Sequence, residues 1–185
     1  HRVERIYQDW LAFFASEEVS AFTMDPQRQD GYFSLRSAEH AKGFRVRDFK
    51  EYFQFYRWGR CPDTLRPDLE SHFNSTLMLG ATLLGYIAHS LPTSVSERLT
   101  EPLRDMIKGS QQTMLRVLHY PPIPEDQPVF RAAPHEDINL LTLLPAADGP
   151  GLELRLPGGE WVSVPHQPGQ LIVNIGDMLQ EATGG

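Results

Sequence analysis

Residues 134–144 read PHEDINLLTLL, so that a His-x-Asp motif, His135 and Asp137, runs directly into an apolar segment. Side chains on a β-strand alternate between two faces, and we therefore expect His135 and Asp137 to share one face while Glu136 points to the other. An imidazole and a carboxylate on one face, joined by a histidine from a distant strand, form the facial triad that holds mononuclear non-haem iron. The stretch predicts an iron site on a β-rich scaffold.

The tripeptide alone is a weak signal, because a surface loop with solvated polar groups would read the same way. Its surroundings favour strands. Short segments rich in apolar residues are separated by turn-forming Gly and Pro, as in 148–151 and 157–159. The strands predicted from this pattern are 114–120, 140–144, 152–156, 161–165 and 171–175. So many short strands close together indicate a sandwich or a jelly roll.

The first half of the chain has a helical period instead. Apolar residues recur at three- and four-residue intervals in 3–14 and 65–91, and Pro92 ends the second run. A shorter helix is predicted for 95–107, interrupted at Pro102. The fold class is therefore α+β, with a helical N-terminal region over residues 1–112 and an incomplete jelly-roll catalytic core over 113–185, both in one structural unit.

Composition and charge exclude some classes of binding partner. The chain has 185 residues and a formal charge of −7, and its arginines form no basic block, which argues against nucleic acid. No apolar run approaches the roughly 18 residues that a membrane span needs. A small-molecule substrate is therefore the expected partner, while the oligomeric state is not predicted. Cys61 is the only cysteine and no secretory signal is visible, so we expect a cytoplasmic protein.

From about residue 7 to 185 the sequence resembles the isopenicillin N synthase-like branch of the Fe(II)/2-oxoglutarate dioxygenases. The order and spacing of four stretches carry the resemblance, which is more specific than any single motif. The stretches are Gly31-Tyr32-Phe33 with Ala41-Lys42-Gly43 and Asp48-Phe49-Lys50-Glu51-Tyr52-Phe53; residues 115–122, LRVLHYPP; His135-Glu136-Asp137 with 141–144; and residues 173–180, VNIGDMLQ.

The resemblance implies a distorted double-stranded β-helix, the jelly roll, with Fe(II) held by His135, Asp137 and a later histidine. It also implies 2-oxoglutarate as cosubstrate and O2 as oxidant. In such proteins a tyrosine on the strand before His-x-Asp often contacts 2-oxoglutarate, and Tyr120 stands at that position. Many relatives have asparagine two residues earlier, where this chain has Leu118. A half-buried aromatic before a proline turn is the alternative interpretation of Tyr120.

The third ligand is missing from its expected place. The family's second histidine and its Arg-x-Ser do not follow Asp137 in this sequence, and His119 and His166 are poorly placed to substitute. His1 begins a His-Arg-Val tripeptide like the one that carries the family's histidine. Either a rearranged chain uses His1 as the third ligand, or the termini are trimmed. We favour trimming, because Val3 enters the first helix directly.

Three functions remain open at this stage. The leading hypothesis is a non-haem Fe(II) dioxygenase that uses O2 and 2-oxoglutarate for hydroxylation or a related C–H oxidation of a small molecule. A close alternative is an isopenicillin N synthase-type oxidase that needs no 2-oxoglutarate. A non-catalytic jelly-roll binding module is the third, supported only by the incomplete triad. As an enzyme the chain would be an oxidoreductase, although these 185 residues could be inactive by themselves.

Overall fold

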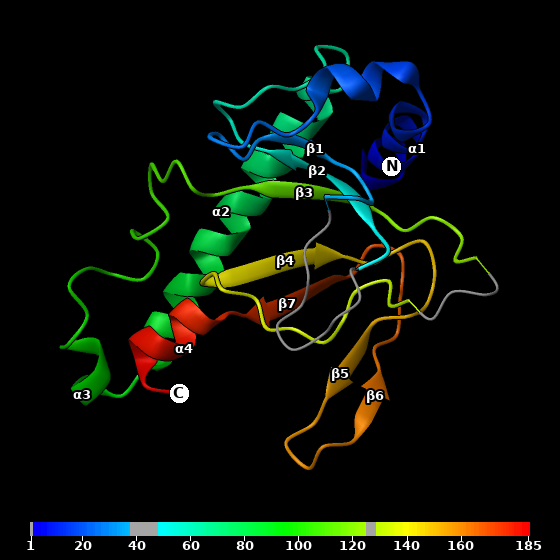
Figure 1. Cartoon of the computed structure of the whole chain (residues 1–185). Coiled ribbons are helices and arrows are strands. Elements are labelled where there is room, and N and C mark those ends of the chain that lie inside the picture. The colour runs from blue at the N-terminus through cyan, green and yellow to red at the C-terminus, as the bar shows by residue number, and fades with distance from the viewer. Residues whose placement is uncertain (1, 38–47, 125–128) are drawn as a thin grey trace. The chain divides into compact units, whose positions relative to one another are not determined.

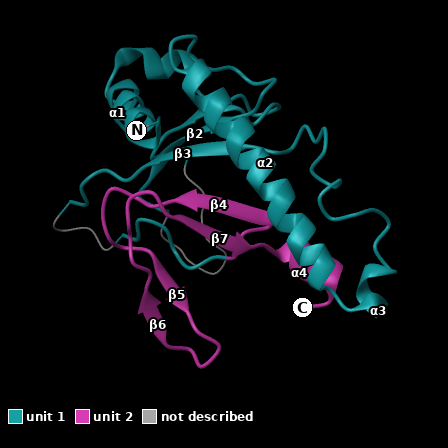
Figure 2. Cartoon of the chain, turned by 180° about the vertical axis from the view of Figure 1, so that it is seen from behind, with its two compact units in different colours: residues 1–135 teal, residues 136–185 magenta. Residues whose placement is uncertain are grey.

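The computed structural model describes residues 2–37, 48–124 and 129–185 (Figure 1). The chain divides into two units, residues 1–135 and 136–185, which are described one at a time (Figure 2). The sequence pattern predicted that the helical region ends at residue 112 and the jelly-roll core begins at residue 113. The structural boundary lies later because the strand that follows residue 112 pairs with a strand of the first unit.

The first unit combines helices with one antiparallel sheet. The sheet has the order β1-β2-β3, and Phe53 in its central strand stands opposite Tyr32 on one side and Val117 on the other. Its elements are α1 (Arg2–Phe14), the 3-10 helix η1 (Glu17–Phe22), β1 (Gly31–Phe33), β2 (Glu51–Phe55), α2 (Arg66–Ser90), α3 (Thr93–Ser96) and β3 (Leu115–His119).

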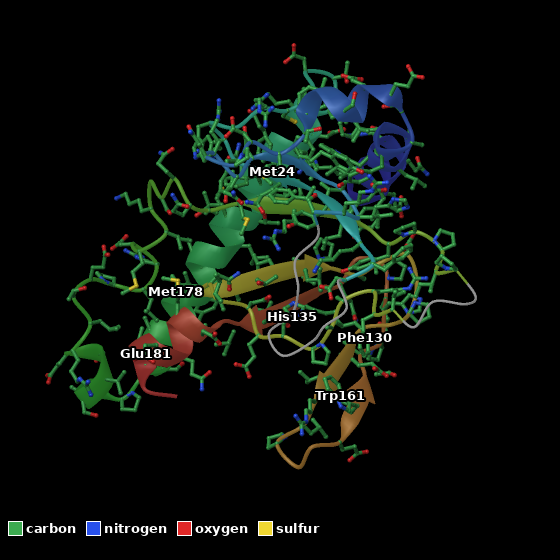
Figure 3. All side chains as sticks on the ribbon, viewed as in Figure 1. Met24, Phe130, His135, Trp161, Met178 and Glu181 are labelled. Atoms are coloured by element: carbon green, nitrogen blue, oxygen red, sulfur yellow. The ribbon has the colours of Figure 1, made fainter. Side chains whose placement is uncertain are left out.

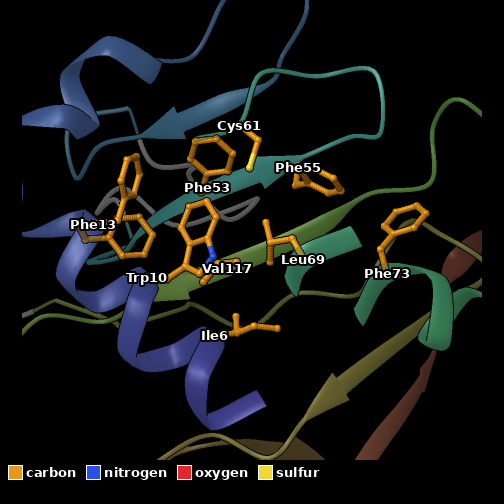
Figure 4. Close-up of a cluster of buried hydrophobic side chains, with 10 residues drawn as sticks. Ile6, Trp10, Phe13, Phe53, Phe55, Cys61, Leu69, Phe73 and Val117 are labelled. Carbon is orange, nitrogen blue, oxygen red and sulfur yellow. The ribbon is translucent and has the colours of Figure 1, made fainter. Parts of the chain in front are cut away.

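An aromatic core joins α1 to the sheet of the first unit (Figure 4). Ile6, Trp10 and Phe13 recur on one face of α1 at the helical spacing that the sequence showed, and all three are buried. The ring centroids of Trp10 and Phe53 lie 4.7 Å apart, and those of Phe13 and Phe53 lie 5.9 Å apart in an edge-on arrangement. The predicted helix over 3–14 is confirmed, and its apolar face forms this core.

Helix α2 is also confirmed. Pro67 stands in its first turn, where the missing N–H has no helical partner to lose, and Pro92 lies just beyond its end. Leu69, Phe73 and Leu84 are its buried large side chains. Although α2 has 25 residues, neither it nor any other helix in the described part of the chain is long and apolar enough to cross a membrane.

The helix predicted for 95–107 is wrong. Only α3, Thr93–Ser96, is helical, and the chain then continues through turns in which several carbonyls accept from the amide three residues later. The amides of Asp105 and Lys108 donate to the carbonyls of Pro102 and Asp105, respectively. Pro102 has no N–H, and its ring would clash with the preceding helical turn, so a helix cannot continue through it.

Strands β1 and β2 were not predicted from the sequence. The segment from 31 to 59 is rich in aromatic residues, but no strand was predicted in it. In β2 the side chains of Tyr52, Phe53, Gln54 and Phe55 are all buried, so the strand shows none of the apolar–polar alternation that identifies a half-exposed strand.

The second unit contains two antiparallel pairs and a short helix. Strands β4 and β7 pair from Leu141 opposite Ile175 to Pro145 opposite Leu171, and β5 pairs with β6 as a hairpin. Its elements are β4 (Leu141–Pro145), β5 (Glu153–Arg155), β6 (Trp161–Ser163), β7 (Leu171–Ile175) and α4 (Asp177–Thr183). All four strands begin within two residues of their predicted positions, and helices and sheets together confirm the α+β class.

Candidate metal centre

His135 is the last residue of the first unit and lies in the segment between β3 and β4 (Figure 3). Its imidazole is exposed, and Nδ1 is 2.8 Å from the carbonyl oxygen of Ala133. A carbonyl can only accept, so Nδ1 carries the proton and donates it. In the neutral ring this leaves the lone pair on Nε2, which is the arrangement of a metal-ligating histidine whose second nitrogen is fixed by a carbonyl.

The segment before His135 is attached to the segment before β2. The amide of Ala133 donates to Asp48 Oδ1 at 2.9 Å, and the amide of Phe49 donates to the carbonyl of Phe130 at 2.7 Å. Lys50 Nζ lies 2.8 Å from Asp48 Oδ2. Asp48 and Lys50 are only 4% and 6% exposed, so the carboxylate sits in a buried ion pair while it holds the backbone of Ala133.

Asp137 belongs to the second unit, where three residues fix it. The hydroxyl of Thr142 is 2.6 Å from Asp137 Oδ2 and also accepts from the side-chain amide of Asn139 at 2.9 Å. Because Asn139 supplies that hydrogen, the Thr142 proton points to the carboxylate. The amide of Asp177 donates to the Asp137 carbonyl at 2.7 Å. The side chain and the backbone of Asp137 are therefore both oriented.

The prediction that His135 and Asp137 lie on a strand is wrong. Residues 135–138 precede β4, whose pairing with β7 begins only at Leu141. Beyond that pair the chain turns at Gly176, where an added Cβ would come within 2.1 Å of the Asn139 carbonyl oxygen. Backbone hydrogen bonds from the Gly176 amide to the Leu140 carbonyl and from the Asp177 amide to the Asp137 carbonyl hold the two segments there. Because the two candidate ligands belong to different units, their presence on one face stays a prediction.

Tyr120 directly follows β3 and is 37% exposed. Burial raises the pKa of its hydroxyl, and the negative charge of Asp48 raises it further. The hydroxyl therefore stays protonated at neutral pH and can donate a hydrogen bond. The guanidinium of Arg131 donates to the Tyr120 backbone carbonyl at 3.0 Å. These contacts are compatible with a role in binding 2-oxoglutarate but do not test it, so that role stays a prediction.

No third ligand is supplied by the described residues. In residues 2–37, 48–124 and 129–185 no group of three His, Cys, Asp or Glu side chains could hold a metal ion. His1 lies outside these residues. His119 is engaged elsewhere: its Nδ1 is 2.7 Å from Glu51 Oε1, and its ring stacks on Phe14. His166 lies exposed in the second unit, in the loop after β6. The donor chemistry fits two positions of a facial triad.

Several supporting residues were not assigned a role from the sequence. Asp48 and Lys50 stood in a stretch that carries the family resemblance, and Thr142 stood in the apolar run after the motif. Asp177 was expected only to shape the turn after its strand. Thr142 and Asn139 are close enough in sequence to Asp137 to have been suggested by spacing. The contact between Asp48 and Ala133 joins residues 85 positions apart, and no local pattern could indicate it.

Comparison with known proteins places the motif in a family. Residues 111–185, which include His135 and Asp137, match the model of the 2OG-Fe(II) oxygenase superfamily. A crystal structure of a candidate oxygenase from Shewanella oneidensis is 45% identical and superposes with a TM-score of 0.87, covering 100% of this chain and 67% of that one.

Two curated relatives agree with this match. The chain is 25% identical to flavanone 3-dioxygenase 2 of Oryza sativa subsp. japonica over 193 residues, which cover 99% of this chain and 54% of that protein. It is 33% identical to a 2-oxoglutarate-dependent dioxygenase of Didymella fabae over 135 residues, 67% of this chain and 39% of that protein. The chain thus spans about half or less of these relatives. It belongs to the 2OG-Fe(II) oxygenase superfamily.

Proposed function

We propose that this chain carries part of the active site of a non-haem Fe(II) dioxygenase that oxidises a small molecule with O2 and 2-oxoglutarate. The observation that carries the proposal is the 2.8 Å contact between His135 Nδ1 and the Ala133 carbonyl, which directs Nε2 to act as the ligand. His135 stands two residues before Asp137, whose carboxylate is oriented by Thr142. Both side chains lie inside the matched region. The superfamily and the dioxygenase names of the relatives support the reaction class.

Bound Fe(II) would activate O2 for oxidation of a C–H bond, while the protein holds the reactants. His135 would bind the metal through Nε2, and the Asp137 carboxylate through the oxygen not used by Thr142. The Tyr120 hydroxyl would donate a hydrogen bond to an oxygen of 2-oxoglutarate. In the balanced reaction the keto acid loses CO2 and leaves as succinate with one oxygen atom, and the other oxygen atom enters the substrate.

The second unit would form part of a jelly roll. Its antiparallel pairs, β4 with β7 and β5 with β6, are the kind of pairing that such a fold contains. The similarity to the Shewanella structure over the whole chain supports this assignment. A small-molecule substrate and a cytoplasmic location stay proposals from the sequence, and the relatives' own substrates differ among themselves.

Metal binding by the full-length protein tests the site. We expect His135→Ala and Asp137→Ala to abolish binding of Fe(II) or Mn(II) in anaerobic calorimetry. Glu136→Ala is the matched control: the exposed Glu136 lies between the two ligands, and its loss should leave the affinity unchanged. Wild-type affinity in both ligand variants would refute the assignment.

Turnover then separates the functional alternatives. Release of succinate from 2-oxoglutarate, dependent on Fe(II) and O2, supports the proposed dioxygenase. Substrate oxidation without succinate would instead identify the isopenicillin N synthase-type reaction. A folded full-length protein that binds no metal would leave only the binding module.

A further inference from the structure

We infer that Asp48 is a positioning residue for the metal ligand His135 and acts through the backbone of Ala133. The inference rests on the proposed iron site, because it concerns how this chain prepares one of that site's ligands. All the residues involved belong to the first unit, so the argument needs no relation between the two units.

The connection consists of two consecutive hydrogen bonds at one peptide segment. The Asp48 carboxylate accepts the Ala133 amide at 2.9 Å, and the Ala133 carbonyl accepts His135 Nδ1–H at 2.8 Å. Ala133 is itself buried, so neither of its polar groups can exchange these partners for bulk water. The orientation of the Ala133 residue therefore determines where the acceptor for Nδ1–H lies, and Asp48 fixes that residue.

The ion pair with Lys50 makes this anchor rigid. Two charges buried side by side cost desolvation free energy, and an apolar pair of the same volume would often be as stable, so burial of the pair is not explained by stability. A carboxylate is, however, a stronger acceptor for a backbone amide than a neutral group. Lys50 places its ammonium group 2.8 Å from that carboxylate, and the Phe49–Phe130 backbone hydrogen bond keeps the two segments together.

As a consequence, His135 has the tautomer required for metal binding already in the metal-free protein. With Nδ1 protonated, Nε2 presents its lone pair and no tautomer change is needed on binding. Outer partners of this kind typically contribute ten- to a hundredfold to metal affinity. Without Asp48 the Ala133 peptide would be free to rotate, Nδ1–H would lose its fixed acceptor, and both tautomers would be populated.

Two double variants isolate the acceptor from the charge. In Asp48→Asn/Lys50→Met the ion pair is removed, but the amide oxygen of Asn can still accept from Ala133. In Asp48→Leu/Lys50→Met the shape is kept and the acceptor is lost as well. We expect the Leu variant of the full-length protein to bind Mn(II) about tenfold or more weakly than the Asn variant. The Asn variant should bind only slightly more weakly than wild type, because its amide oxygen still accepts but is a weaker acceptor than a carboxylate.

The second measurement is independent of metal. Nitrogen-15 NMR of histidine side chains in the metal-free protein reports the tautomer, and His135→Gln identifies the His135 signal among the seven histidines. We expect the Nδ1–H tautomer in wild type and the Asn variant, and a mixture in the Leu variant. A merely structural role would lower thermal stability without changing the tautomer.

Several outcomes would overturn the inference. One is a folded Leu variant with wild-type Mn(II) affinity and an unchanged tautomer. Another is the Nε2–H tautomer in the wild-type protein, which decides the matter even if the Leu variant does not fold. If wild type itself binds no metal, the proposed function fails, and the tautomer comparison still tests the connection from Asp48 to His135.

Discussion

The two units differ in where their apolar side chains lie. The first unit buries a continuous aromatic and aliphatic cluster around Trp10 and Phe53. In residues 136–185, all of which the structure describes, Leu179 is the only large apolar side chain counted as buried. Exposed large apolar side chains of the second unit include Leu154, Trp161, Val173 and Ile175. The second unit is therefore held mainly by strand pairing and turn contacts.

This contrast bears on the candidate iron ligands. Full burial of one large apolar side chain contributes about 1.5–3 kcal/mol, so the first unit has a large hydrophobic contribution and the second has little. His135 is attached to the strongly packed unit through Ala133, whereas Asp137 depends on polar contacts with Thr142 and Asp177. His135 is therefore positioned by a segment attached to an apolar core, whereas Asp137 is positioned by hydrogen bonds.

The largest expected effect tests this contrast directly. Phe53 is fully buried and packs against Trp10 and Phe13, so Phe53→Ala should lower the free energy of unfolding by about 3–5 kcal/mol. Urea denaturation followed by circular dichroism measures the change.

Trp161→Ala in β6 is the matched control. This side chain is as large and aromatic but 45% exposed, and its loss should change the free energy of unfolding by about 0.5 kcal/mol or less. Equal losses in the two variants would mean that the second unit holds a core of comparable strength, and the comparison between the units would fail.

A smaller effect is expected at Gly176, where the second unit relies on close backbone approach. An added Cβ would lie 2.1 Å from the Asn139 carbonyl oxygen, so the turn that carries the Asp177–Asp137 hydrogen bond must shift. We expect Gly176→Ala to cost about 1–3 kcal/mol, the range of overpacking, and to weaken Mn(II) binding by the full-length protein.

Gly149→Ala controls for the general effect of removing a glycine in this unit, because an added Cβ there meets nothing within 4 Å. Its stability and metal affinity should stay near those of wild type. Unchanged metal affinity in a folded Gly176→Ala protein would show that the turn does not position Asp137.

The sequence predicted those elements whose side chains have a single periodicity. The apolar stripe of α1 and the short apolar runs of β4 and β7 identified them correctly. Strand β2 was missed because both of its faces are buried, and the helix over 95–107 was wrong because Pro102 outweighs the apolar spacing around it.

At the candidate metal site, the identities of the ligands could be predicted from the sequence, but the hydrogen bonds that position them could not. The identities of His135 and Asp137 followed from the motif and its family context, while their placement on a strand did not hold. The bonds from Asp48 to Ala133 and from Asp177 to Asp137 connect segments distant in sequence, and only the tertiary fold brings them together. Such contacts leave no local pattern of spacing or polarity.

The smallest expected effect concerns a polar contact that belongs to the first unit alone. Asp30 is fully buried, and its carboxylate accepts from the Arg60 backbone amide at 2.7 Å and from the Arg60 guanidinium at 3.0 Å. Burial pushes the pKa of this carboxyl up, but the hydrogen bonds and charge of Arg60 outweigh it, so the pKa lies below its ordinary value.

A carboxyl whose folded-state pKa is depressed stabilises the fold above its unfolded pKa of about 3.9, and this contribution disappears as pH falls through the folded value. The free energy of unfolding should therefore decrease below about pH 4. Asp30→Asn keeps the shape but replaces charged hydrogen bonds with neutral ones, which should cost about 1 kcal/mol at pH 7 and flatten that acid dependence. Urea denaturation of both proteins between pH 7 and pH 3 measures the two slopes. If the slopes are parallel, the pKa of Asp30 is the same in the folded and unfolded states, and its contact with Arg60 does not cause the acid dependence.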